Sequence, residues 1–178
     1  MSKSLPLLLG RQVTLDAALA SVDDMRVELS WPAKQEAFFS HLREQQANIE
    51  ALVSFHLGLS ASERCHISEP KEWMLGYYNV CIPVSIDGWV RCPGKRVLVR
   101  IPLPYKLGEA EHPGNAEEKL RCEAATFIWI QEQCPDVPIP QLWGFGFPSG
   151  QCVRCLVRGN STLLRVKPRA PTDSFACL

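Results

Sequence analysis

The amino-acid sequence predicts an α+β fold, in which an antiparallel sheet of about five strands carries one helix and follows a helical extension. Between residues 73 and 146, short apolar runs with the alternation of β-strands are separated by turn sequences. The long interruption of that pattern, Asn115–Gln133, has apolar residues three or four positions apart, as on one face of a helix. At 178 residues, the chain has room for one ordinary domain and an extension.

The first 32 residues are expected to be weakly ordered, apart from a short helix near Leu15–Ala20 with Thr14 as its N-cap. Residues 33–70 are assigned to a helical extension and a linker. A stripe of apolar residues runs along positions 33–59 and ends at Gly58, a residue that commonly terminates helices. We expect this helix to pack on the domain that follows it; the alternative is an amphipathic helix that binds a partner.

The linker, residues 61–70, contains Cys65 and His66 and is predicted to be a loop. Adjacent residues do not have the spacing of metal ligands, and no further ligands accompany them. We therefore assign no metal site to this pair.

The domain itself is predicted over residues 71–158, and it begins with two strands joined by a turn at Gly76-Tyr77-Tyr78-Asn79. Glycine in a turn lets backbone N–H groups approach a phosphate closely, and asparagine can hold the turn by bonding its own backbone. The same four residues also fit a plain hairpin. Pro83 predicts that the second strand is at an edge or contains a bulge, because proline donates no ladder hydrogen bond.

The third strand, residues 97–101, and the helix Asn115–Gln133 each carry one charged residue where apolar residues are expected. Arg100 interrupts the apolar strand, and Glu123 falls inside the apolar stripe of the helix. A charge on such a face is costly unless an opposite charge or several donors meet it. We therefore predict that Arg100 and Glu123 form a buried ion pair. The stripe of the helix consists of Ala116, Leu120, Ala124, Phe127, Ile128 and Gln131.

The start and the continuation of this helix also follow from the sequence. Asn115 and Glu118 have the spacing of a capping box, in which each side chain accepts from a backbone N–H that the helix leaves unpaired. After Cys134-Pro135 a proline-rich fourth strand is expected to run through Leu142 to Gly146, and a fifth at residues 152–157.

The ordered combination of LGYYN, VLVRIPLP, KLRCEAATFIWI and CPDVPIPQLWGFG, over about residues 33–150, resembles the aminoglycoside phosphotransferase-like family and its divergent fungal members in particular. That family has a protein-kinase-like fold. The resemblance implies that residues 71–158 form a kinase-like small lobe, in which residues 115–133 are the αC-type helix.

The resemblance also implies a nucleotide-binding site made of Gly76, Asn79, Arg100 and Glu123. In protein kinases a strand lysine pairs with a helix glutamate and holds the nucleotide phosphates. Arg100 would replace that lysine, since its planar guanidinium can engage a carboxylate and a phosphate together. The cofactor implied is ATP with Mg.

Phosphoryl transfer in this family needs a second lobe with an H-x-D-x-x-x-x-N segment and a metal-binding aspartate. No histidine of the sequence is followed by aspartate two positions later, and Asp173 is the only carboxylate side chain after Gly146. We therefore expect a truncated member: the nucleotide-binding half of an ATP-dependent hydroxyl phosphotransferase, inactive by itself, with no catalytic or metal-binding residues and weak or absent ATP binding. The alternative is a non-catalytic protein-interaction module that uses the helix at 33–59 and the exposed sheet.

Charge and composition narrow the choice of partners. Residues 1–150 hold 14 Lys and Arg against 18 Asp and Glu, whereas residues 151–178 hold five against one. The basic residues of this end are scattered and have no interleaved aromatic residues, so a solvated end is favoured over nucleic-acid binding. No apolar run is long enough to span a bilayer, and we expect no membrane partner.

The eight cysteines have irregular spacing and no secretory signal accompanies them, so reduced thiols and a cytoplasmic location are expected. Cys152 and Cys155 have the C-x-x-C spacing of a zinc knuckle or a redox pair. The further ligands and the helical context that those sites need are missing, so we expect a strand there. Residues 159–178 show no periodicity and are expected to form an irregular tail.

Overall fold

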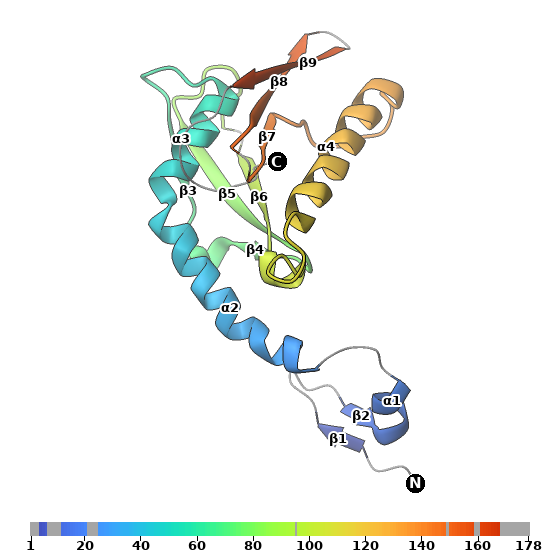
Figure 1. Ribbon diagram of the computed structural model, residues 1–178. Coiled ribbons are helices and arrows are strands. Elements are labelled where there is room, and N and C mark those ends of the chain that lie inside the picture. The colour runs from blue at the N-terminus through green and yellow to red at the C-terminus, as the bar shows by residue number, and fades with distance from the viewer. Residues whose placement is uncertain are drawn as a thin grey trace. The chain divides into compact units, whose positions relative to one another are not determined.

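A computed structural model of the chain describes residues 4–6, 12–20, 25–94, 96–148, 150–158 and 161–167. The chain divides into two units, Met1–Phe38 and Phe39–Leu178. Helices and strands carry the labels of Figure 1.

The first unit contains two short antiparallel strands, β1 (Ser4–Pro6) and β2 (Gln12–Thr14), followed by the helix α1 (Leu15–Ala20). The predicted short helix is confirmed, and so is its cap, since Thr14 Oγ1 accepts a hydrogen bond of 3.2 Å from the Ala17 N–H. The strand pair was not predicted, because three-residue strands carry too little alternation to be recognised. Most of α2 (Met25–Glu44) also belongs to this unit.

The helical extension is two helices rather than one. α2 ends at Glu44, Gln45 is a turn, and α3 (Gln46–Leu57) follows it. The predicted stop at Gly58 is confirmed: this residue has φ 63°, and its N–H and that of Leu59 bond to the carbonyls of Phe55 and Ser54. α3 contacts β3, β7 and β8 and buries Ile49, Val53, His56 and Leu57. The predicted packing of this part of the extension on the domain is therefore confirmed.

The first sheet of the second unit is antiparallel and has four strands. β5 (Asn79–Asp87) lies at its centre, with β6 (Val97–Pro102) along one side and both β3 (Arg64–Ile67) and β4 (Met74–Leu75) along the other. Between β3 and β4 the chain passes through a 3₁₀ turn, η2 (Pro70–Glu72). The predicted loop around Cys65 and His66 is thus wrong, because these residues pair with Ile86 and Ser85 of β5.

Pro83 is also placed differently from the prediction, since β5 has partners on both sides. The register explains how proline is tolerated there: β3 ends opposite Val84 and β4 begins opposite Cys81, so Pro83 lies at the gap between them. Its carbonyl still accepts a hydrogen bond of 2.8 Å from the Ser68 N–H. A missing N–H costs nothing where no strand stands opposite it.

The second sheet has three antiparallel strands, β7 (Gly144–Gly146), β8 (Cys152–Arg158) and β9 (Ser161–Lys167). The strand predicted at 152–157 is confirmed as β8, and the fourth strand is shorter than predicted. The irregular tail is wrong for residues 161–167, which form β9; its other residues lie outside the described part of the chain. Instead of one sheet of about five strands, the described residues of the second unit form two sheets, because β8 pairs with β7 and β9 whereas β6 pairs with β5.

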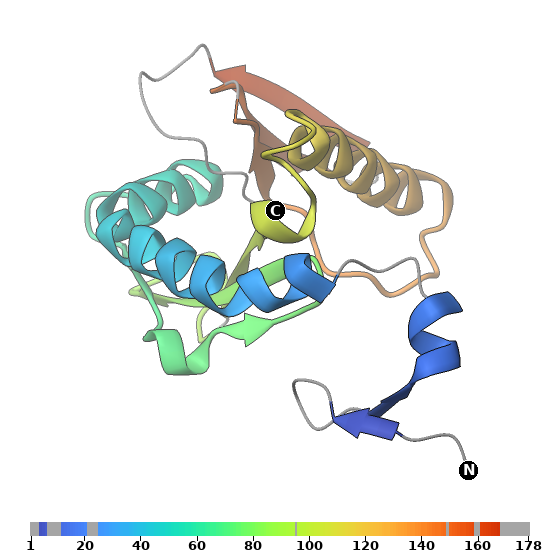
Figure 2. The same cartoon turned by 60° about the horizontal axis from the view of Figure 1, so that its bottom comes forward.

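α4 (Asn115–Gln133) packs on the second sheet, and in both views the strands β5 to β8 lie between α3 and α4 (Figures 1 and 2). The predicted stripe faces this core: Ala116, Leu120 and Ala124 are buried, and Phe127 and Ile128 are packed against the core cluster. The cluster contains Leu120, Ala124, Leu142, Phe145, Phe147, Val153 and Cys155. The α+β class with an antiparallel sheet is confirmed.

The capping box predicted at the start of α4 is wrong. The N-cap is Gly114, at φ 105°, and the carboxylate of Glu109 accepts bonds of 2.7 Å from the N–H groups of Gly114 and Ala116. Asn115 instead donates its side-chain amide to the Leu107 carbonyl at 2.8 Å. This loop contains a second 3₁₀ turn, η3 (Pro104–Lys106), and folds back so that its own carboxylate caps the helix.

Replacement of Glu109 by alanine is therefore expected to destabilise the protein by about 1 kcal/mol, because it removes a cap from two helix N–H groups. Urea unfolding followed by circular dichroism measures the effect. Glu111→Ala is the matched control in the same loop, and an equal loss in both variants would contradict this assignment.

In the part of the chain that the structure describes, no helix is long and apolar enough to cross a membrane.

Candidate functional site

The predicted pair of Arg100 and Glu123 is present and joins β6 to α4. Arg100 Nη1 lies 2.9 Å from Glu123 Oε2. The contact is an ion pair whose angles fall outside hydrogen-bond geometry, since the buried Oε2 has no hydrogen-bond partner in the described residues. The pair is less buried than predicted: the Arg100 side chain is 32% exposed and that of Glu123 is 23% exposed.

A second cation, Lys119, which was not predicted, completes the site. Lys119 Nζ donates a hydrogen bond of 2.5 Å to Glu123 Oε1 and another of 3.1 Å to Asn79 Oδ1. Lys119 lies one helical turn before Glu123, on the same face of α4. Glu123 is therefore held between two cations, one on each carboxylate oxygen, and Lys119 connects it to the first residue of β5.

Three of the four residues of the predicted site lie in one network, and the fourth, Gly76, does not. Asn79, Arg100 and Glu123 belong to one network, whereas Gly76 lies in the turn, where its N–H donates to the Asn79 carbonyl at 2.8 Å. The Gly76 N–H is thus engaged within the hairpin. The Asn79 side chain is buried and bonds to Lys119 rather than to its own backbone.

This arrangement has the chemistry of an anion site. Two cations converge on one carboxylate, so the cluster keeps a net positive charge beside the β4–β5 turn. A guanidinium carries five N–H donors in one plane, and the contact to Glu123 involves Nη1. A phosphate could be received by the remaining donors without breaking the ion pair.

Arg100→Ala is expected to lower the free energy of unfolding by about 1–3 kcal/mol, because it leaves a buried carboxylate oxygen without its cation. We expect a smaller loss of stability than for a fully buried pair, because both side chains are partly exposed and Glu123 keeps its second cation. A double-mutant cycle with Glu123→Gln, followed by urea denaturation, measures the coupling. A coupling energy below about 0.5 kcal/mol would mean that the pair contributes only as an exposed one does.

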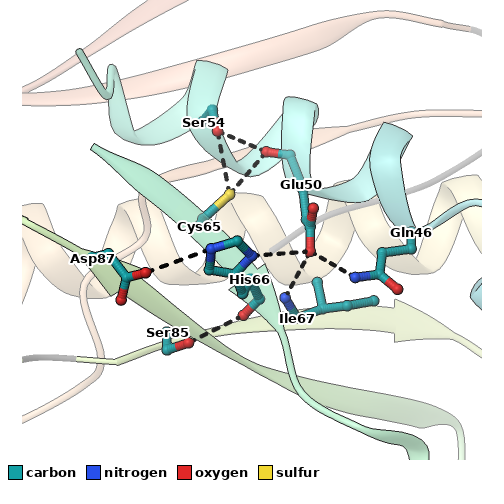
Figure 3. A network of polar contacts seen from close by, with 8 residues as sticks. All are labelled: Gln46, Glu50, Ser54, Cys65, His66, Ile67, Ser85 and Asp87. Atoms are coloured by element: carbon teal, nitrogen blue, oxygen red, sulfur yellow. Dashed lines mark hydrogen bonds and ion pairs between the residues drawn. The ribbon is translucent and has the colours of Figure 1, made fainter. Parts of the chain in front are cut away.

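A second polar network, around Cys65 and His66, fastens α3 to the first sheet (Figure 3). Glu50 Oε1 accepts from the Ile67 N–H at 3.1 Å, and the Cys65 thiol donates to the Glu50 carbonyl at 3.0 Å. Burial raises the pKa of the Cys65 thiol, which makes it a poor nucleophile. His66 lies 3.5 Å from Asp87 and 4.0 Å from Glu50. These contacts hold secondary structure together and present no reactive group.

Cys152 and Cys155 do not form a joint site. They are three positions apart on β8, so their side chains point to opposite faces of the strand. Burial raises the pKa of the Cys155 thiol to about 11. Within the described residues, no group of three or more His, Cys, Asp or Glu side chains is placed to hold a metal ion.

Comparisons with protein-family models, with curated proteins and with solved structures gave no match.

Proposed function

We propose that residues 71–158 are the nucleotide-binding small lobe of a kinase-like phosphotransferase, of the aminoglycoside phosphotransferase-like kind, and that they bind ATP with Mg. The observation that carries the proposal is the ion pair between Arg100 on β6 and Glu123 on α4. A strand cation paired with a carboxylate on the following helix is the device with which kinases hold the phosphates of the nucleotide.

The order of the elements supports the same proposal. A hairpin, β4–β5, comes first, the strand with the cation follows, and then come the helix with the carboxylate and a further antiparallel hairpin. In the proposed site Arg100 and Lys119 contact the phosphates. Glu123 orients both cations, and Asn79 positions Lys119 below the turn.

We propose that this chain binds the nucleotide, and we assign no phosphoryl transfer to it. The sequence contains no H-x-D segment that could position an acceptor hydroxyl, and we assign no catalytic base to it. With one lobe supplying the contacts, we expect a dissociation constant of about 1 mM or weaker for Mg-ATP, which corresponds to roughly 4 kcal/mol of binding.

Thermal unfolding with Mg-ATP tests the proposal. At about ten times a 1 mM dissociation constant, bound nucleotide stabilises the folded state by about 1.4 kcal/mol and raises Tm by a few degrees. Lys119→Met is expected to weaken Mg-ATP binding by about fivefold, the equivalent of roughly 1 kcal/mol.

Arg121→Met is the matched control, because Arg121 lies on the same helix but pairs with Glu117 at an exposed position. Tripolyphosphate in place of ATP shows whether the site requires a nucleotide or accepts any polyanion. If Mg-ATP leaves Tm unchanged, or if both variants lose the same affinity, the proposed site is wrong.

The second candidate function is a non-catalytic interaction module. It is favoured by one observation: Met74, Leu75, Tyr77 and Tyr78 expose apolar side chains on β4 and its turn. The apolar face of α3 is not open to a partner, since it packs on the strands. An unchanged Tm with Mg-ATP would support this function.

A further inference from the structure

The strand β6 has a free edge in the part of the chain that the structure describes. Its partner there is β5, along one side, and no described strand lies along the other side. The backbone N–H and C=O groups on such an edge form a template on which a further strand can pair. The free edge of β6 is therefore a candidate binding surface.

The register of β5 shows which groups of β6 point to the free edge. The Pro83 carbonyl accepts from the Ser68 N–H, which lies on the side of β5 away from β6. Alternate residues of an antiparallel strand bond to opposite sides, so Pro83 and Cys81 both face away from β6. Their partners in the register are Leu98 and Arg100. These two residues consequently direct their N–H and C=O groups to the free edge and not to β5.

A groove of about 310 Å³ runs along this edge. Residues 96–100 line it without a gap, and residues 140–144 form a second unbroken stretch of its lining. A strand that turned one face to the groove would contribute every second residue, because its side chains alternate. The unbroken stretch therefore means that β6 faces the groove with its edge, where a further main chain can approach.

One face of β6 brings positive charge to this groove. Arg100 faces α4, where it pairs with Glu123, and Leu98 shares that face and is 50% exposed. Arg96, directly before the strand, also lines the groove and is exposed. The groove thus has two guanidinium groups in its lining, and carboxylates would complement them.

The other face of β6 is apolar. Val97 and Val99 point away from the face of Arg100, and Val99 is buried. Val53 and Leu57 of α3 line the groove together with these valines. Apolar side chains of a bound segment would be removed from water here.

We propose that the free edge of β6 binds an extended segment of another protein, in which carboxylate side chains alternate with branched apolar ones. The main chain of the segment bonds to Leu98 and Arg100 as an added strand, and its alternate side chains give specificity. Every second side chain lies on the face of Arg100, and the others lie on the face of Val97 and Val99. The proposal does not rest on the nucleotide site, since it uses the backbone of β6 and the chemistry of its two faces.

Amide NMR spectra and hydrogen exchange of the full chain test the proposal. The probe is a heptapeptide with blocked ends in which glutamate alternates with valine. The N–H groups of Leu98 and Arg100 are expected to shift and to become protected from exchange. Those of Val97 and Val99 should change little, because they already bond to β5. Two control peptides, one with the glutamates and valines in separate blocks and one with lysine in place of glutamate, should bind at least about tenfold more weakly.

Two variants of Leu98 separate the backbone from the side chain. Leu98→Pro removes an N–H that points to the free edge and keeps the bonds to β5, a position at which an edge strand tolerates proline. It is expected to weaken binding of the alternating peptide by about tenfold, whereas Leu98→Ala weakens it by no more than about threefold. Arg96→Glu should weaken it by about fivefold. Arg96 is changed here because Arg100 belongs to the proposed nucleotide site.

If Leu98→Pro does not fold, Arg96→Glu and the control peptides decide. The proposal is overturned if the N–H groups of Leu98 and Arg100 stay unprotected with about 1 mM of the alternating peptide. It is also overturned if either control peptide binds equally well, or if Leu98→Ala weakens binding as much as Leu98→Pro. Shifts of the same N–H groups with rising protein concentration alone would contradict it too, since a second copy of the chain would then occupy the edge.

Discussion

Replacement of Leu120 by alanine is expected to lower the free energy of unfolding by about 2–5 kcal/mol, the largest effect on stability predicted for this chain. Leu120 is fully buried in the cluster where α4 meets the second sheet, beside Leu142 and Phe145. Its removal leaves a cavity that the surrounding strands can fill only in part. Urea unfolding followed by fluorescence measures the loss.

Trp129→Ala is the control for this variant. Trp129 lies on the exposed face of the same helix, and its removal is expected to change stability by no more than about 0.5 kcal/mol. Because α4 also carries Lys119 and Glu123, a loosened helix should weaken any Mg-ATP binding as well. A loss below about 1 kcal/mol for Leu120→Ala would show that α4 is not docked as described.

Acid is expected to destabilise the protein through His56. The folded state holds the pKa of His56 at about 4, below the ordinary histidine value of 6.5, because burial and the nearby Arg154 disfavour the imidazolium. As the pH falls below 6.5, His56 becomes protonated in the unfolded chain but stays neutral in the folded state. The free energy of unfolding therefore decreases until the pH reaches the pKa of the folded state. Between pH 7 and about 4.5 the loss from this group is about 2 kcal/mol.

His56→Phe should remove that part of the acid sensitivity. Urea unfolding of the wild type and the variant at both pH values measures how much free energy of unfolding each protein loses. The carboxylates contribute to the loss in both proteins, so the difference between the two losses is the contribution of His56. If both proteins lose stability in parallel, His56 is not held neutral in the folded state.

The Arg100–Glu123 pair could be predicted from the sequence because both residues break a regular apolar pattern. The period of the helix places Glu123 among apolar residues, and Arg100 is the one charge in the apolar strand 97–101. Two such charges of opposite sign are satisfied by pairing with each other. The role of Lys119 was not predicted, because a lysine one turn before a glutamate is usual on exposed helix faces. Its spacing from Glu123 was the available signal, but its contact with Asn79 depends on how the sheet is placed.

The features that were predicted wrongly depend on contacts between residues that are far apart in the sequence. Glu109 caps α4 in place of Asn115 because the preceding loop turns back, and no local pattern encodes that turn. The second sheet forms because β8 pairs with β9, and strand order is set by contacts far apart in the chain. Gly144 and His56, 88 positions apart, meet through that same arrangement.

Amide NMR spectra recorded during a titration with Mg-ATP test the central claim most directly. If the chain is a nucleotide-binding lobe, the resonances of the β4–β5 turn, Arg100 and Lys119 should shift together, with a dissociation constant of about 1 mM or weaker. Arg100→Ala should abolish these shifts. Spectra that stay unchanged up to about ten times that concentration, or shifts that survive in Arg100→Ala, would contradict the account.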